Sequence, residues 1–329
     1  MERWTSQRFR RALRLSGPYL QLALAGGLLA ALVLRVDAGE LQRHIGKANL
    51  LWLPPILAAN FVSDWFRAVR WQHLLSPISR PRVSLLFAAA QVGSAVGLLL
   101  PLRAGEAVCI RIVCKRTGLS VSTVLATVFS EKLADLGVFA GFITIGLLLV
   151  GNIAFLWPLS LAFGALTAVG IIGGNYLASR LDRWPERAVN TGRKNIGIRF
   201  RREIYRFATG FKSFRDPSSM FNVGWSSFAA YVSEAFLFYA SGQALGLGLS
   251  PWAYLLVVVG ANIASALPIT QAGIGVFEVT ATGMMVALGV DEPLAAAYAI
   301  FVHILLSIPH VISGPLAALF LRISHSEIR

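Results

Sequence analysis

Residues 93–106 read GSAVGLLLPLRAGE, and residues 260–278 read GANIASALPITQAGIGVFE. In both stretches a run of apolar and small residues is interrupted by proline and glycine, and a glutamate follows where the apolar pattern resumes. Broken apolar segments at corresponding places in two halves of a chain are typical of membrane transporters built from repeats, whose sites lie at the breaks. The two stretches therefore predict a membrane protein made of two related halves.

The composition indicates the same class of protein. Of the 329 residues, 56% are hydrophobic and only 14% are charged. A soluble domain of this size cannot bury so much apolar surface, so the bilayer must be its solvent. The formal net charge of +14 would suggest a nucleic-acid partner in a soluble protein. Here the basic residues flank apolar segments, and we expect no nucleic-acid partner.

The apolar segments predict the architecture. The expected fold is an all-α polytopic membrane protein with about six full transmembrane helices plus two re-entrant helical hairpins, arranged as an inverted repeat. We expect a single integral membrane domain over residues 1–329, with repeat half 1 at 50–150 and repeat half 2 at 222–321. The expected hairpins are 83–116 and 252–288. The expected spans lie near 18–36, 50–66, 124–150, 154–178, 222–247 and 294–321.

The placement of basic residues predicts the orientation. Residues 179–216 carry eleven Lys and Arg residues, whereas none occurs between Arg215 and Arg322. Because Lys and Arg accumulate in cytoplasmic loops, we expect both termini and the basic loop 179–216 in the cytoplasm. The first hairpin would then enter from the cytoplasm and the second from outside. Aromatic residues in the basic loop, among them Phe207 and Phe211, are typical of an element that lies on an anionic leaflet.

Glu131 and Asp135 are four residues apart and therefore share one face of a helix. Charged groups at membrane depth usually face the protein interior or a water-filled path. These two could line a polar cavity, or they could form a salt bridge with Arg103 or Arg111.

Arg103 and Glu106 lie at the break of the first expected hairpin. A guanidinium offers a planar fork that suits a phosphate group, and helix N-termini at a break also favour anions. The alternative is that Arg103 and Glu106, three residues apart, pair with each other.

Glu234 and Glu278 lie in the half without Lys or Arg. They could pair with arginines of the first half, be protonated, or bind a cationic substrate group. Arg67 and Arg70, beside Trp65 and Trp71, resemble an interfacial anchor that could also admit lipid headgroups.

His303 and His310 lie seven residues apart on one helix face. They could relay protons or pack beside Pro309.

Four motifs follow one another along the chain: Arg70-Trp71-Gln72-His73-Leu74-Leu75, Pro101-x-Arg103-x-Gly105-Glu106, Glu131-Lys132-x-x-Asp135 and Pro268-x-x-x-x-Gly273-x-Gly275-x-x-Glu278. Together they resemble the flippase-like membrane domain of lysylphosphatidylglycerol synthases. The resemblance covers about residues 18–321. Bifunctional members of this family also carry a cytosolic aminoacyltransferase domain, whereas the resemblance here is to their membrane domain. It therefore implies a stand-alone member that translocates lipid without synthesising it.

The expected function is lipid translocation in the bacterial cytoplasmic membrane. We expect no enzymatic activity, catalytic residue, metal or cofactor, since nucleotide-binding and metalloprotease motifs are absent from the sequence. The expected partners are membrane phospholipids, anionic or aminoacylated, with a second copy of the chain or a lipid-modifying enzyme as further partners. The residues expected along the substrate path are Arg70, Arg103, Gly105, Glu106, Glu131, Asp135, Pro268, Gly273, Gly275 and Glu278.

Three other functions fit the same sequence. One is a secondary transporter for a small anion or amphiphile. Another is a membrane enzyme that uses Glu131 and Asp135 as an acid–base pair. The third is a scaffold that docks a lipid-modifying enzyme through residues 179–216.

Overall fold

The computed structural model describes residues 21, 23–32, 38–101, 103–150, 156–181, 196–267 and 269–322. Every regular element in these ranges is a helix, which confirms the predicted all-α fold. Pro268, the N-terminal arginines and the middle of the basic loop lie outside the described residues.

The helices are α2 Ala38–Gly46, α3 Leu53–Leu75, α4 Val83–Leu99, α5 Ala104–Thr117, α6 Val121–Val150, α7 Trp157–Leu181, α9 Ile196–Thr209, α10 Pro217–Ala244, α11 Pro251–Ala266, α12 Val276–Ala287 and α13 Glu292–Phe320. Short 3-10 turns are η1 Leu50–Trp52, η3 Lys212–Arg215 and η4 Gln271–Gly273.

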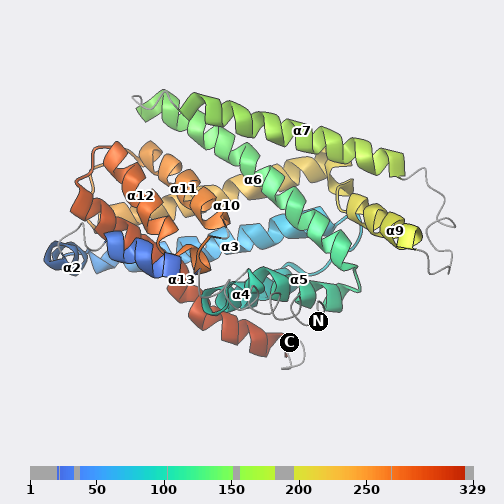
Figure 1. Cartoon of the computed structure of the whole chain (residues 1–329), viewed down its shortest axis with the longest axis horizontal. Coiled ribbons are helices and arrows are strands. Elements are labelled where there is room, and N and C mark those ends of the chain that lie inside the picture. The colour runs from blue at the N-terminus through green and yellow to red at the C-terminus, as the bar shows by residue number, and fades with distance from the viewer. Residues whose placement is uncertain are drawn as a thin grey trace, which may run out of the picture. The chain divides into compact units, whose positions relative to one another are not determined.

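One order of helices occurs twice along the chain (Figure 1). A long helix, a broken pair and a second long helix form α3, α4–α5 and α6, and then α10, α11–α12 and α13. Helices α7 and α9 lie between the two series in the sequence. The division into two repeat halves stays a prediction.

Three described helical segments are long and apolar enough to cross a membrane, which makes the chain a multi-pass membrane protein. They are Val121–Val150, Trp157–Tyr176 and Glu292–Phe320. Helices α3 and α10 also have sufficient length, with 23 and 28 residues. Their buried polar side chains, including those of Arg70 and Glu234, make them less apolar, so the predicted number of six crossings stays a prediction.

Both expected hairpins consist of two helices separated by a break. Helices α4 and α5 have 17 and 14 residues, and α11 and α12 have 16 and 12. Helices α11 and α12 lie side by side (Figure 1). Near the breaks the backbone enters the left-handed region at Arg103, Ala272, Gly273 and Gly275, with φ angles of 56°, 52°, 76° and 85°. A helix cannot continue through this conformation.

The basic loop 179–216 is partly helical. Helix α7 runs to Leu181, and α9 and η3 follow within the same stretch. Helix α9 packs on α6, where the Thr123 hydroxyl donates to the Arg206 carbonyl oxygen over 3.2 Å. Phe129 of α6 makes an edge-on contact with Phe211, which is buried. The expectation that Phe211 faces the leaflet is therefore wrong, because α6 provides an aromatic surface that covers it.

The chain divides into two compact units, and each is described by itself. Unit 1 comprises Met1–Ala58, Val92–Ala107 and Ala235–Leu316, and unit 2 comprises Ala59–Gln91, Val108–Glu234 and Ala317–Arg329.

Glycines bring neighbouring helices close together within each unit. In unit 2 a Cβ on Gly170 of α7 would lie 2.4 Å from the Leu133 side chain of α6. In unit 1 a Cβ on Gly242 of α10 would lie 2.0 Å from the Tyr254 hydroxyl of α11. Small residues at such contacts allow the close van der Waals packing by which helices associate in membranes.

Candidate functional site

Unit 2 contains a charge cluster formed by α3, α6 and α10. We use this term for Arg67 and Arg70 of α3, Glu131, Lys132 and Asp135 of α6, and Tyr231 and Glu234 of α10. The side chains at 67 and 70, at 131 and 135, and at 231 and 234 are three or four residues apart, which places each pair on one face of its helix. The cluster is therefore produced by three polar helix faces that meet.

Arg70 lies at the centre of the charge cluster, and none of its side chain is exposed. Its Nη1 donates to Asp135 Oδ1 over 2.6 Å and lies 3.4 Å from Ser227 Oγ. Its Nη2 donates to Glu131. One guanidinium thus satisfies two carboxylates, which is the arrangement a buried charge requires.

Arg67 forms the second arm of the charge cluster. It is ion-paired with Glu234 of α10. Its guanidinium also lies 4.6 Å from the centre of the Tyr231 ring and within 3.5 Å of the Tyr231 hydroxyl. The combination of a cation–π contact and an ion pair fixes Arg67 on the face of α10.

The charges of this cluster balance. Arg67, Arg70 and Lys132 supply three positive charges, and Glu131, Asp135 and Glu234 supply three negative ones. A neutral, internally paired cluster suits the joining of three helices at membrane depth better than the binding of a charged headgroup.

Two sequence-based expectations about this region are revised. Glu131 and Asp135 pair with Arg70, so the expected salt bridge to Arg103 or Arg111 is wrong. Arg70 and Trp71 are buried, so they are no interfacial anchor. The Trp71 indole donates to Thr127 over 3.0 Å.

Glu234 pairs with Arg67, which lies in the first half of the chain. Such a pairing was one of the alternatives considered from the sequence. Ser227 and Tyr231, which contact Arg70 and Arg67, were not predicted from the sequence. Their spacing with Glu234 along one face of α10 was the available signal.

Unit 1 contains the two hairpin breaks. We call the residues between α4 and α5 the first break and those between α11 and α12 the second break. The Arg103 guanidinium in the first break donates to the carbonyl oxygen of Ala266, the last residue of α11. In return, Gln271 Nε2 in the second break donates to the Leu98 carbonyl oxygen of α4 over 2.9 Å. Each break thus satisfies a helix-terminal carbonyl of the other, which would otherwise lack a partner.

Arg103 also pairs with Glu106, at 3.2 Å between Nη1 and Oε1. This is the local pairing considered from the sequence. The Arg103 and Glu106 side chains are nevertheless 40% and 51% exposed. Of the predicted path residues, these two are the most accessible charged groups that the structure describes.

Gly105 at the start of α5 allows α4 and α5 to approach closely. A Cβ on Gly105 would lie 2.1 Å from the Gly93 carbonyl oxygen and 2.7 Å from the Gly97 nitrogen. Gly93 and Gly97 are four residues apart, the small-residue spacing of close helix contacts in membranes. Gly105 therefore has a packing role at the first break.

Glu278 closes the second break. Its Oε2 accepts a hydrogen bond from the Gly275 backbone nitrogen over 2.6 Å, at the start of α12. Its Oε1 lies 2.7 Å from Nδ1 of His303 in α13. The expected pairing of Glu278 with an arginine is wrong, because its partner is a histidine of its own half. Gly273 and Gly275 supply the left-handed turns that place this carboxylate at the helix terminus.

Ala272 in the second break has a φ angle of 52°, which strains a residue with a Cβ. Replacing Ala272 with glycine is expected to stabilise the protein by about 0.5–1 kcal/mol. The left-handed region costs an L-residue about 1–2 kcal/mol, and the freedom of glycine in the unfolded chain offsets about half of that. Thermal unfolding in detergent measures the change.

The matched control is Ala261→Gly, inside α11, which is expected to lower the unfolding temperature. A lower unfolding temperature for Ala272→Gly would show that the strain at Ala272 does not govern stability.

The predicted site residues fall into two groups, one in each unit. Within the described ranges, no group of three or more His, Cys, Asp or Glu side chains could hold a metal ion. Arg70, Glu131 and Asp135 belong to the charge cluster of unit 2. Arg103, Gly105, Glu106, Gly273, Gly275 and Glu278 lie at the breaks in unit 1.

These features define a polytopic helical membrane protein with paired helix breaks and buried ion pairs. The chain belongs to the family described as the lysylphosphatidylglycerol synthase TM region, whose model matches residues 19–314. The resemblance inferred from the four motifs is thereby confirmed.

Two archaeal proteins are similar to this chain. Glycosyltransferase AglD of Haloferax volcanii is 25% identical over 342 residues, which cover 90% of this chain and 53% of that protein. The chain thus spans about half the length of this relative. A UPF0104 membrane protein of Methanothermobacter thermautotrophicus is 24% identical over 296 residues, covering 77% of this chain and 83% of that protein.

Proposed function

We propose that this protein is a lipid translocase that moves a phospholipid or a lipid-linked polar headgroup between the leaflets of the cytoplasmic membrane. It would do so without ATP hydrolysis and without enzymatic chemistry of its own. The observation that carries the proposal is the exposed Arg103–Glu106 pair at the point where the two hairpin breaks bind each other. A cation beside a broken helix is suited to holding a lipid phosphate.

The proposed architecture is an inverted repeat with two re-entrant hairpins. The four helices of the hairpins have 12 to 17 residues, fewer than the roughly 20 needed to cross a bilayer. Irregular backbone at membrane depth is tolerated only where protein or a watery cavity covers it. The reciprocal bonds of Arg103 and Gln271 satisfy one helix-terminal carbonyl on each side, which supports placing the two breaks at membrane depth. The cytoplasmic location of both termini and the bacterial source stay predictions.

The proposed substrates are anionic or aminoacylated phospholipids, because all of them carry the phosphate that Arg103 would bind. The guanidinium fork presents parallel N–H donors to phosphate oxygens. One Nη of Arg103 already donates to Ala266. Binding a phosphate would therefore compete with a contact between the two breaks, which couples headgroup binding to the contact between the hairpins.

The proposal is tested by lipid scrambling in liposomes that contain the purified protein and a fluorescent phosphatidylglycerol. We expect the wild-type protein to exchange the lipid between leaflets and Arg103→Gln to slow the exchange about 10- to 100-fold. This range follows from the loss of a charge-assisted hydrogen bond worth about 1.5–3 kcal/mol. Dithionite quenching of the outer leaflet gives the rate.

The matched control is Arg111→Gln, which removes an exposed arginine of α5 away from the break and should leave the rate unchanged. Unfolding temperatures separate loss of function from loss of fold. Arg103→Lys keeps the charge and should retain part of the rate. Equal rates for the wild type and Arg103→Gln would exclude the site. No exchange of any lipid by the folded wild-type protein would favour a transporter for a small amphiphile or anion.

A second function is a scaffold for a lipid-modifying enzyme. The observation that favours it is the match to half of a protein named as a glycosyltransferase. In that case the chain would hold or present a lipid-linked substrate to an enzyme. A folded protein that exchanges no lipid but copurifies with a lipid-modifying enzyme would support this function over translocation.

A further inference from the structure

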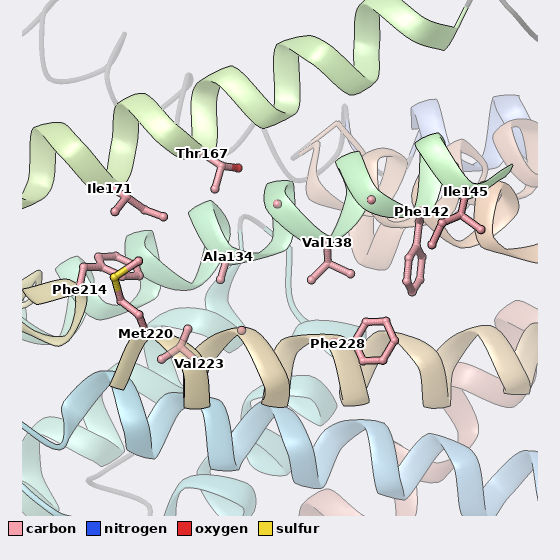
Figure 2. A pocket seen from close by; sticks show the side chains of 13 residues that line it. Ala134, Val138, Phe142, Ile145, Thr167, Ile171, Phe214, Met220, Val223 and Phe228 are labelled. Carbon is pink, nitrogen blue, oxygen red and sulfur yellow. The ribbon is translucent and has the colours of Figure 1, made fainter. Parts of the chain in front are cut away.

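Unit 2 contains an apolar pocket of about 420 Å³ between α6, α7 and α10 (Figure 2). Phe214 and Met220 lie at one end of the pocket, and Phe142, Ile145 and Phe228 lie at the other. Its volume is within the range of about 300–1,000 Å³ found for ligand pockets. None of the predicted path residues lines this pocket.

The pocket is elongated and runs along α6. Its lining extends from Ala134 to Ile145, which corresponds to about 16 Å of helix at 1.5 Å per residue. Thr167 of α7 is the polar side chain in the lining, and its hydroxyl bonds to the carbonyl oxygens of Leu133 and Phe163. An elongated pocket without free polar groups suits an extended hydrocarbon chain.

Glycines create the space of the pocket. A Cβ on Gly141 of α6 or on Gly224 of α10 would meet no atom within 4 Å, although both residues line the pocket. By contrast, a Cβ on Gly137 would lie 3.3 Å from Thr167. One glycine of α6 therefore brings α7 close, and the next one, a turn later, leaves a gap. Larger residues at Gly141 or Gly224 would fill this gap without forcing the helices apart.

The surroundings of the pocket indicate its occupant. Only 11% of the apolar window of α7 is buried, compared with 39% for α6. Exposed apolar side chains such as Val169 and Ile172 of α7 and Trp225 of α10 face outward next to the lining residues. In a membrane protein such surfaces contact acyl chains. The pocket opens onto these surfaces, because Gly141, Gly224 and Phe228 of its lining are exposed, so the neighbouring lipid is the available occupant.

We propose that this pocket binds one acyl chain of a membrane phospholipid. The methylene groups gain dispersion contacts with close-packed side chains on several sides, which the fluid bilayer does not provide to the same degree. This binding site does not depend on lipid translocation.

Phe142 connects the pocket to the charge cluster. Its ring makes an edge-on contact with Tyr231 at 6.5 Å between centroids, and Arg67 lies over the same Tyr231 ring. A bound chain at the Phe142 end would therefore support the aromatic residue on which Arg67 rests.

The test uses the full-length protein in vesicles that contain a phosphatidylcholine with a diazirine on one acyl chain. After irradiation, mass spectrometry locates the adducts. We expect adducts on lining residues of α6 and α10, and we expect Gly141→Leu combined with Gly224→Leu to reduce them about tenfold, because a filled space excludes the chain.

The matched control is Gly164→Leu on α7. Gly164 is exposed, a Cβ there would also meet no atom within 4 Å, and it does not line the pocket. Adducts in the pocket should persist in this variant.

Equal adduct yields in the wild-type protein and the double variant would overturn the proposal, as would wild-type labelling confined to outward-facing residues of α7. If the double leucine variant fails to fold, the single variants Gly141→Ala and Gly224→Ala replace it. Each is expected to reduce the adducts by a smaller factor. If the folded wild-type protein exchanges no lipid but its pocket residues are still labelled, the proposed translocase function is rejected and the acyl-chain site is retained.

Discussion

Replacing Arg70 with methionine is expected to destabilise the protein by about 3–5 kcal/mol, because removing one partner of a buried ion pair leaves uncompensated charge. The Asp135 carboxylate would keep only Lys132, 3.4 Å away, as its ion-pair partner in the charge cluster. Glu131 would lose its ion pair with Arg70. Thermal unfolding in detergent and the yield of monodisperse protein measure the effect.

Neutralising the carboxylates is expected to reverse most of this loss. Arg70→Met combined with Glu131→Gln and Asp135→Asn leaves no unpaired buried charge, because the group that loses its partner is Lys132, whose side chain is 52% exposed. Such replacement of a whole buried ion pair is often nearly neutral. Arg80→Met is the matched control, since Arg80 is an exposed arginine of the same unit. If Arg70→Met unfolds at the wild-type temperature, the ion pairs of Arg70 do not hold α3 against α6. Normal scrambling by the folded triple variant would show that these charges act in structure alone.

Replacing Gly105 with alanine is expected to separate α4 from α5 at the first break. The new Cβ would lie 2.1 Å from the Gly93 carbonyl oxygen and 2.9 Å from the Gly97 Cα, both backbone atoms that cannot rotate away. Overpacking typically costs about 1–3 kcal/mol, and we expect the upper end of this range here. The shift would also move the neighbouring Arg103, so scrambling should fall with the unfolding temperature.

Gly97→Ala is the matched control for this prediction. A Cβ on Gly97 would have Gly105 Cα as its neighbour at 3.9 Å, an ordinary contact. The two substitutions add the same methyl group on opposite sides of one helix contact. Similar unfolding temperatures for the two variants would mean that α4 and α5 do not approach as described.

The breaks between α4 and α5 and between α11 and α12 could be predicted from the sequence because their signals are local. Proline and glycine interrupt an apolar run within a few residues, and these interruptions coincide with the ends of α4, α5, α11 and α12. The same local signals do not determine how deeply the hairpins enter the bilayer.

The partners of the charged residues could not be predicted in the same way. Glu131 and Asp135 were correctly placed on one helix face, but their partner Arg70 is 61 and 65 residues away in sequence. Tertiary packing alone selects it from the many arginines of the chain. Glu278 was expected to pair with an arginine, whereas its partner is His303 of the neighbouring helix α13. The pocket also escaped prediction, because it results from two glycines on different helices.

The reciprocal bonds between the breaks have a consequence for biosynthesis. The residues they join are 163 and 173 positions apart in the chain. At about 5–20 residues per second, the ribosome needs on the order of ten seconds or more after completing the first hairpin to make the second. During that interval the Leu98 carbonyl lacks the Gln271 amide, and Arg103 lacks the Ala266 carbonyl. The first break thus gains its final hydrogen bonds only after the second break has been synthesised, so its maturation is a late step.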